Sequence, residues 1–164
     1  MTEEEFTEFY TYSVRRLVGQ LYTMTGDLHE AQDVVQEAFE RAWGHRRALD
    51  RDGAPEAWVR RTAWRLAVSR WRRARVGAQA WLRRDDAQLV PGPDPGGVDL
   101  ALALRALPSR QRICAALFYV CDLPVDQIAA ETGLASGTVK THLSRARTAL
   151  AALLGETSPS EETP

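Results

Sequence analysis

The chain has 164 residues, of which 45% are apolar and 26% are charged, and its formal net charge is −1. This length favours one domain or two small ones, and the composition excludes wholesale disorder. No apolar run approaches the roughly 18 residues of a membrane-spanning helix. The acidic start, Met1-Thr2-Glu3-Glu4-Glu5, does not resemble a signal peptide. We therefore expect a cytoplasmic protein without membrane insertion.

Charge is distributed unevenly along the chain. Residues 1–57 carry 12 acidic and 6 basic side chains, whereas residues 58–84 contain nine arginines and no acid. Four of the five tryptophans lie in this arginine-rich block. The segregation indicates a polyanionic partner for one surface and a different partner for another.

The N-terminal part predicts three helices. The first extends from about Phe6 to Thr25, where Gly26 is a stop signal. The second begins after Asp27, which we expect to be its N-cap, and ends near Arg47. A polar segment from His45 to Ala54 is predicted to be a loop.

The third predicted helix begins at Pro55 and ends near Arg75. On a helical wheel, one arc contains Val59, Ala63, Leu66, Ala67, Trp71 and Ala74, which we expect to be buried. The opposite arc contains Trp58, Arg61, Thr62, Arg65, Ser69, Arg72 and Arg73. A solvated arginine face is the alternative, but ordinary exposed faces include acidic partners, and this one has none. Arginine binds phosphates and aromatic rings stack on unpaired bases, so we favour contact with nucleic acid.

A break follows the third helix. Residues 91–97 read Pro-Gly-Pro-Asp-Pro-Gly-Gly, a sequence in which we expect no helix. The sequence predicts an all-α protein of two small helical domains, residues 1–77 and 99–155, joined by a flexible linker at 78–98. Residues 156–164 are predicted to form a disordered acidic tail.

The C-terminal domain contains a predicted helix-turn-helix. A helix from Leu107 to about Cys121 precedes a short helix over residues 124–132, and Gly133 breaks the chain before a long helix from about Ser136. The second helix of such a motif enters a major groove. Here that helix would present short polar and basic side chains to the groove. A plain antiparallel helix pair is the alternative.

These motifs together resemble the extracytoplasmic-function (group 4) sigma factors of bacterial RNA polymerase, a family within the sigma-70 superfamily. The resemblance covers the chain from Phe6 to Leu154. It is carried by the stretches 33–43 (DVVQEAFERAW), 57–63 (AWVRRTA), 104–112 (LRALPSRQR) and 137–147 (GTVKTHLSRAR).

The resemblance implies a role for each stretch. Domain 1–77 corresponds to sigma region 2 and domain 99–155 to sigma region 4. The core polymerase is expected to bind Asp33, Gln36, Glu37 and Glu40. The −10 promoter element is expected to bind Trp58, Arg60, Arg61, Arg65 and Arg72, with loop 45–54 holding an extruded base. The −35 element is expected to bind Thr138, Lys140, Thr141, Ser144, Arg145 and Arg147. Many relatives carry Asn in place of Arg65, which leaves the base read at that position open.

The implied partners are core RNA polymerase, through its β′ clamp helices and its β subunit, and promoter DNA. Members of the family are often held by anti-sigma proteins, so an anti-sigma factor is a further expected partner of this chain, which we expect to be monomeric when free. No nucleophile, cofactor motif or metal-ligand spacing is evident, so we expect no enzymatic activity, cofactor or metal. The alternative function is a stand-alone helix-turn-helix regulator, which would require a dimer interface.

Overall fold

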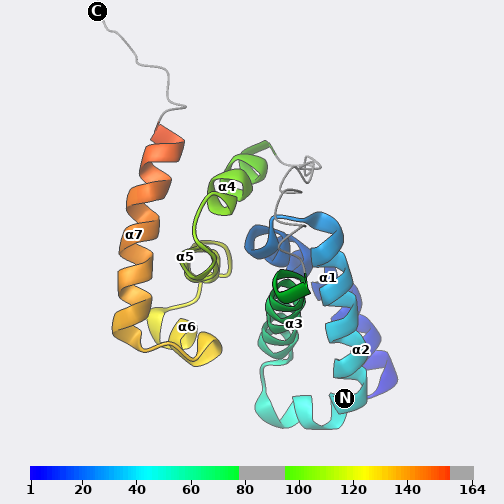
Figure 1. Ribbon diagram of the computed structural model, residues 1–164. Helices are drawn as coiled ribbons and strands as arrows, with labels where there is room; N and C mark the ends of the chain where they lie inside the picture. The colour runs from blue at the N-terminus through cyan, green and yellow to red at the C-terminus, as the bar shows by residue number, and fades with distance from the viewer. Residues whose placement is uncertain (78–94, 156–164) are drawn as a thin grey trace, which may run out of the picture. The chain divides into compact units, whose positions relative to one another are not determined.

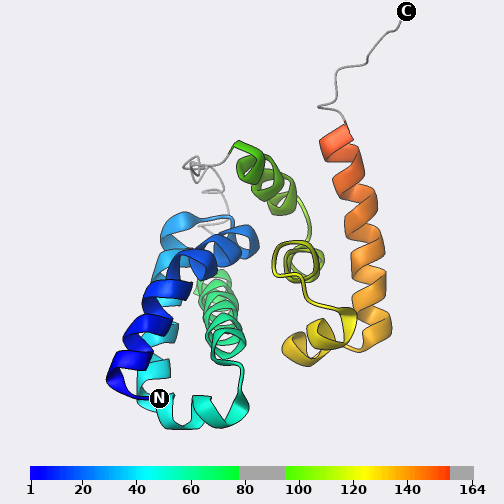
Figure 2. The ribbon, with the colours of Figure 1, turned by 180° about the vertical axis from the view of Figure 1, so that it is seen from behind.

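The computed structural model describes residues 1–77 and 95–155, and every regular element within those ranges is a helix (Figures 1 and 2). The chain divides into two compact units, Met1–Val90 and Pro91–Pro164. The all-α fold predicted from the sequence is therefore confirmed. Most of the predicted linker and all of the predicted acidic tail lie outside the described residues.

The first unit packs α1 (Glu3–Thr25), α2 (Leu28–Asp52) and α3 (Pro55–Gly77) against one another. Its core includes the fully buried side chains of Leu17, Leu21, Val34, Val35 and Val59. Each such side chain contributes roughly 1.5–3 kcal/mol relative to full exposure. This packing determines how the outer faces of α2 and α3 lie relative to each other.

The predicted end of α1 and the predicted start of α2 are confirmed by their caps. Gly26 ends α1 in the left-handed region, with φ of 71°. Asp27 is the N-cap of α2, and its side chain accepts a hydrogen bond from the Glu30 backbone N–H at 3.1 Å. Asp27 thereby satisfies one of the amide donors that the first turn of a helix leaves without a partner.

The predicted loop from His45 to Ala54 is wrong. The second helix continues to Asp52 and ends at Gly53, whose φ is 64°. Leu49 lies seven residues after Ala42, and both are buried, so the core-facing stripe of α2 continues through this polar segment. The polar residues of the segment lie on the outer face of a helix.

The predicted arcs of α3 need one correction. Val59, Ala63 and Leu66 are buried as expected, but Trp71 is 49% exposed and Ala74 is also exposed. Trp64, which belongs to neither predicted arc, is buried. Residues 71–74 are exposed, so the buried face of α3 ends at about Arg70.

The second unit contains α4 (Pro95–Arg105), α5 (Ser109–Ala115), the π-helical turn η1 (Ala116–Val120), α6 (Val125–Thr132) and α7 (Ser136–Gly155). The start of α4 at Pro95 contradicts the expectation that residues 91–97 hold no helix. Proline suits a first helical turn because its missing N–H would have no intrahelical acceptor there. The prediction of a single helix from Leu107 to Cys121 is also corrected, since its second half forms the π-helical turn η1.

The core of the second unit supports the helix-turn-helix. Leu104, Leu117, Ile128 and Val139 are fully buried and come from α4, η1, α6 and α7. Gly133 ends α6 with φ of 75°, and its N–H donates to the Ala129 carbonyl at 2.9 Å. The left-handed conformation, which glycine adopts without steric penalty, turns the chain from α6 into α7. The predicted turn at Gly133 is confirmed.

Candidate binding surfaces

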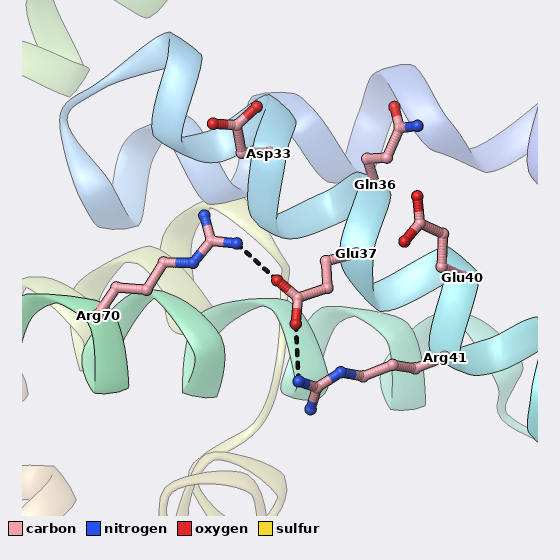
Figure 3. A pocket seen from close by; sticks show the side chains of 6 residues that line it. All are labelled: Asp33, Gln36, Glu37, Glu40, Arg41 and Arg70. Atoms are coloured by element: carbon pink, nitrogen blue, oxygen red, sulfur yellow. Dashed lines mark hydrogen bonds and ion pairs between the residues drawn. The ribbon is translucent and has the colours of Figure 1, made fainter.

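One exposed face of α2 brings together the four residues predicted to bind a protein partner. Figure 3 shows Asp33, Gln36, Glu37 and Glu40 along the helix, lining an open hollow of about 590 Å³. Asp33, Gln36 and Glu40 are exposed, and Glu37 is half-buried. Their spacing of three and four residues places them on adjacent turns of one helical face. We call this group the acidic surface.

Two arginines, Arg41 of the same helix and Arg70 of α3, complete the hollow. The Glu37 carboxylate accepts a hydrogen bond from Arg41 at 2.7 Å through Oε1 and one from Arg70 at 2.5 Å through Oε2 (Figure 3). The hydrogen bond from Arg70 lowers the pKa of Glu37, and Arg41 adds to the effect. The Glu37–Arg41 pair has the i,i+4 spacing that sequence reasoning can detect. Arg70 lies on another helix, 33 residues away, and no local pattern reveals its contact.

An aromatic hollow adjoins the acidic surface. Gln36 and Glu40 line both hollows, and the second is completed by Phe6, Tyr10, Phe39 and Trp43. The Trp43 side chain is 38% exposed, and the Arg46 guanidinium lies over its ring at 4.2 Å from the centroid. An aromatic face beside charged groups suits a protein contact, because aromatic rings supply a large contact area and lose little conformational entropy on binding.

The arginines of α3 occupy different environments. Arg65 and Arg72 are exposed and Arg61 is half-buried, consistent with the predicted outer face. Arg60, which the resemblance implied as a −10 contact, is only 6% exposed and does not lie on that face. Arg70 contacts the acidic surface of α2 instead of facing outward. The arginines whose side chains the structure describes in α3 therefore lie in the core, against the neighbouring helix and on the outer face.

The aromatic residues of α3 are divided in the same way. Trp58, predicted to lie in the −10 site, is half-buried and meets the His45 ring edge-on, with centroids 5.8 Å apart. Trp64 is buried, and the Arg65 guanidinium lies 5.8 Å from its ring centroid. Trp71 is the exposed ring of this helix among its described residues, although the sequence placed it in the core. An exposed ring beside arginines is a platform on which an unpaired base can stack.

The outer face of α7 contains all six residues predicted for it. Thr138, Lys140, Thr141, Ser144, Arg145 and Arg147 are exposed. The opposite face buries Val139, Leu143, Ala146 and Leu150. Arg147 Nε donates to the Tyr119 hydroxyl at 3.2 Å, which ties that side chain to η1. We call the six residues the α7 face.

Two other titratable groups in the second unit are affected by burial. Burial lowers the pKa of the half-buried His142, and Arg110 and Arg145 lower it further. Burial also raises the pKa of the Cys114 thiol to about 11, so the thiol stays protonated at neutral pH. Cys114 is buried, whereas the second cysteine of this unit, Cys121, is partly exposed.

Residues 1–77 and 95–155 contain no cluster of three or more His, Cys, Asp or Glu side chains placed to hold a metal ion. Within the same ranges, no helix is both long and apolar enough to cross a membrane.

Comparison with known families places the two units. Residues 9–76 match the model of sigma-70 region 2, and residues 98–150 match that of sigma-70 region 4. The chain is 30% identical to the ECF RNA polymerase sigma factor SigW of Bacillus subtilis, over 90% of this chain and 88% of the relative. It is also 30% identical to the ECF RNA polymerase sigma factor SigK of Mycobacterium tuberculosis, over 90% of this chain and 83% of that one.

Solved structures share the fold. The sigma factor RpoE from Bartonella quintana, in complex with the anti-sigma factor NepR, matches with a TM-score of 0.75 at 23% identity, covering 94% of this chain and 99% of that one. CnrH, in complex with the cytosolic domain of CnrY, matches with a TM-score of 0.65 at 23% identity, covering 96% and 92%. The sequence identity, the region matches and the common fold agree: the chain belongs to the extracytoplasmic-function sigma factors of the sigma-70 family.

Proposed function

We propose that this chain binds core RNA polymerase and directs it to promoters by recognising −35 and −10 elements and promoting DNA opening. The observation that carries the proposal is the separation of an acidic surface on α2 from arginine-bearing and polar-basic faces on α3 and α7, within a member of the sigma family. A stand-alone regulator would leave the acidic surface of α2 without a role.

The acidic surface is the proposed contact with core polymerase, through the β′ clamp helices and in addition the β subunit. Asp33, Gln36 and Glu40 are exposed, and their carboxylate and amide groups suit basic and polar groups of a partner. Charged groups at such an interface accelerate association and select the correct partner.

The outer face of α3 is the proposed −10 site. Arg61, Arg65 and Arg72 are placed to bind phosphates of the opened strand, with Trp58 at the start of the helix. Unstacking a base costs a few kcal/mol, and contacts made only with the extruded base offset that penalty. Arg60 is buried, so we assign it a supporting role within the helix rather than a direct contact.

The α7 face is the proposed −35 site. Short side chains at Thr138, Thr141 and Ser144 allow the helix backbone to approach base edges, while Lys140 and Arg145 supply donors for bases and phosphates. Arg147 is farther along the helix and suits a backbone contact.

The proposed activity requires binding and strand separation only, because the polymerase performs nucleotidyl transfer. We further propose that the free protein is a cytoplasmic monomer and that an anti-sigma protein regulates it. The complex of the sigma factor RpoE with the anti-sigma factor NepR supports that last point.

The test is binding to purified bacterial core polymerase. The wild type is expected to form a stable complex, and Asp33→Ala/Glu40→Ala is expected to weaken it by at least about tenfold, because it removes two interfacial charges. Glu4→Ala/Glu8→Ala is the matched control, since it removes two exposed carboxylates from α1. Dimeric binding of duplex DNA without any core binding would contradict the proposal and support a stand-alone regulator.

A further inference from the structure

Arg70 lies between two acidic residues of α2. Its Nη2 donates to Glu37 Oε2 at 2.5 Å, and its Nη1 lies 3.8 Å from Glu30 Oε1. Glu30 and Glu37 are seven residues apart, so their positions are separated by about 10 Å along the helix axis. One guanidinium of α3 therefore bridges two turns of the helix that carries the acidic surface.

The Glu37 carboxylate is engaged from both sides, unlike its neighbours. One oxygen accepts from Arg41 and the other from Arg70 (Figure 3). Asp33 and Glu40 form no ion pair with any residue that the structure describes, and both are exposed. The acidic surface thus divides into outward carboxylates at Asp33 and Glu40 and an inward one at Glu37.

We propose that Arg70 is a positioning residue for polymerase binding: through Glu37 it fixes α2 against α3, so that Asp33, Gln36 and Glu40 meet the partner in one arrangement. This inference rests on the proposed function. It assigns Glu37 to the anchor rather than to the direct contact with the polymerase.

An explanation by net charge alone predicts the opposite effect of substituting Arg70 on polymerase binding. If only net charge mattered to a basic partner, Glu37→Gln would weaken binding and Arg70→Gln would strengthen it. If the two residues act as an anchor, both substitutions weaken binding. The double variant then loses no more than either single variant, because each already breaks the same contact.

The experiment measures the affinity of Arg70→Gln, Glu37→Gln and the double variant for core polymerase, at a temperature where circular dichroism shows each to be folded. The side chains of Arg70 and Glu37 are 35% and 32% exposed, so we expect a loss of about threefold in each of the three variants. Arg70→Lys should restore part of the affinity, since an ammonium retains one charged contact. Arg15→Gln is the control for charge and should bind as wild type, because Arg15 is exposed on α1.

Several results would overturn the proposal. If one single variant bound core polymerase more weakly and the other more tightly, the effect would be one of net charge. If the affinity losses of the two single variants multiplied in the double variant, the two residues would make independent contacts. A lower unfolding midpoint with unchanged core affinity would indicate a purely structural pair. Unchanged core affinity with weaker DNA binding by the assembled polymerase would make Arg70 a DNA contact. Failure of the wild type to bind core polymerase would instead refute the proposed function.

Discussion

The helices α3 and α7 both carry basic side chains on an outer face, yet they are built differently. The arginines of α3 are divided among the core, the neighbouring helix and the outer face, as Arg60, Arg70 and Arg65 illustrate. On α7 the basic residues are exposed and lie among short polar side chains. A high density of arginine in the sequence is therefore not a measure of the charge that a helix presents.

The chemistry of the two faces differs as well. Arginine beside an exposed tryptophan on α3 suits phosphates and unpaired bases, which lie at varied angles and offer aromatic faces. Thr, Ser, Lys and Arg on α7 suit the edges of paired bases in a major groove, where a helix must approach closely. Under the proposed function, the first face serves opened DNA and the second serves duplex DNA.

The largest expected effects come from substitutions that separate the two faces. Lys140→Ala should weaken binding of the assembled polymerase to a duplex −35 fragment by about tenfold, with little effect on a pre-opened −10 fragment. Arg65→Ala should do the reverse, because it removes a phosphate-binding group from α3. Both affinities are measured by fluorescence anisotropy. The DNA fragments are those that polymerase assembled with the wild-type chain selects from a random pool. Equal losses on both fragments for either variant would remove the proposed division.

A smaller effect should follow from glycine substitution in the helix-turn-helix. Gly133→Ala forces a side chain into a left-handed conformation and should lower the free energy of unfolding by about 1 kcal/mol. Gly137→Ala, at an ordinary helical position with no atom within 4 Å of the added Cβ, should raise it by about 0.5 kcal/mol.

The first unit offers the same glycine comparison at Gly53, which has φ of 64°, and Gly44, which lies within α2. Urea unfolding measures the free energy of unfolding of Gly133→Ala, Gly137→Ala, Gly53→Ala and Gly44→Ala. If Gly133→Ala were as stable as the wild type while Gly53→Ala was less stable, the turn after α6 would be able to relax without cost, unlike the turn after α2.

The smallest expected effect concerns acid stability of the first unit. The pKa of Glu37 is lowered in the folded state, mainly by the hydrogen bond from Arg70. Its stabilising contribution is therefore complete above the unfolded-state pKa of about 4.3 and is lost as pH falls through the lowered folded-state value. Glu37→Gln should accordingly lose less stability than the wild type between about pH 5 and pH 3. Parallel pH profiles by thermal unfolding would contradict this role of Glu37.

Much of the fold could be predicted because its signals are local. Asp27, Gly26 and Gly133 mark helix ends through the backbone conformations and hydrogen bonds that they favour, and each lies where the sequence indicated. The residues of the α7 face were also predictable, from the helix-turn-helix motif and the resemblance to the family, and all six are exposed.

The errors share a different cause. His45 to Ala54 looked like a loop because its composition is polar, but buried Leu49 keeps the segment helical. Trp71 looked buried because it continues an apolar arc, yet the packing of α3 ends before it. Both outcomes depend on how far a neighbouring helix extends.

The sequence by itself determined the helical architecture, the turn at Gly133 and the family, because these depend on interactions over a few residues and on ordered motifs. Only the tertiary structure decided which arginines of α3 are free to face a partner, since that depends on the crossing of α2 and α3. The hydrogen bond from Arg70 to Glu37 joins residues 33 positions apart. Packing of apolar faces brings them together, and no periodicity along the chain encodes their contact.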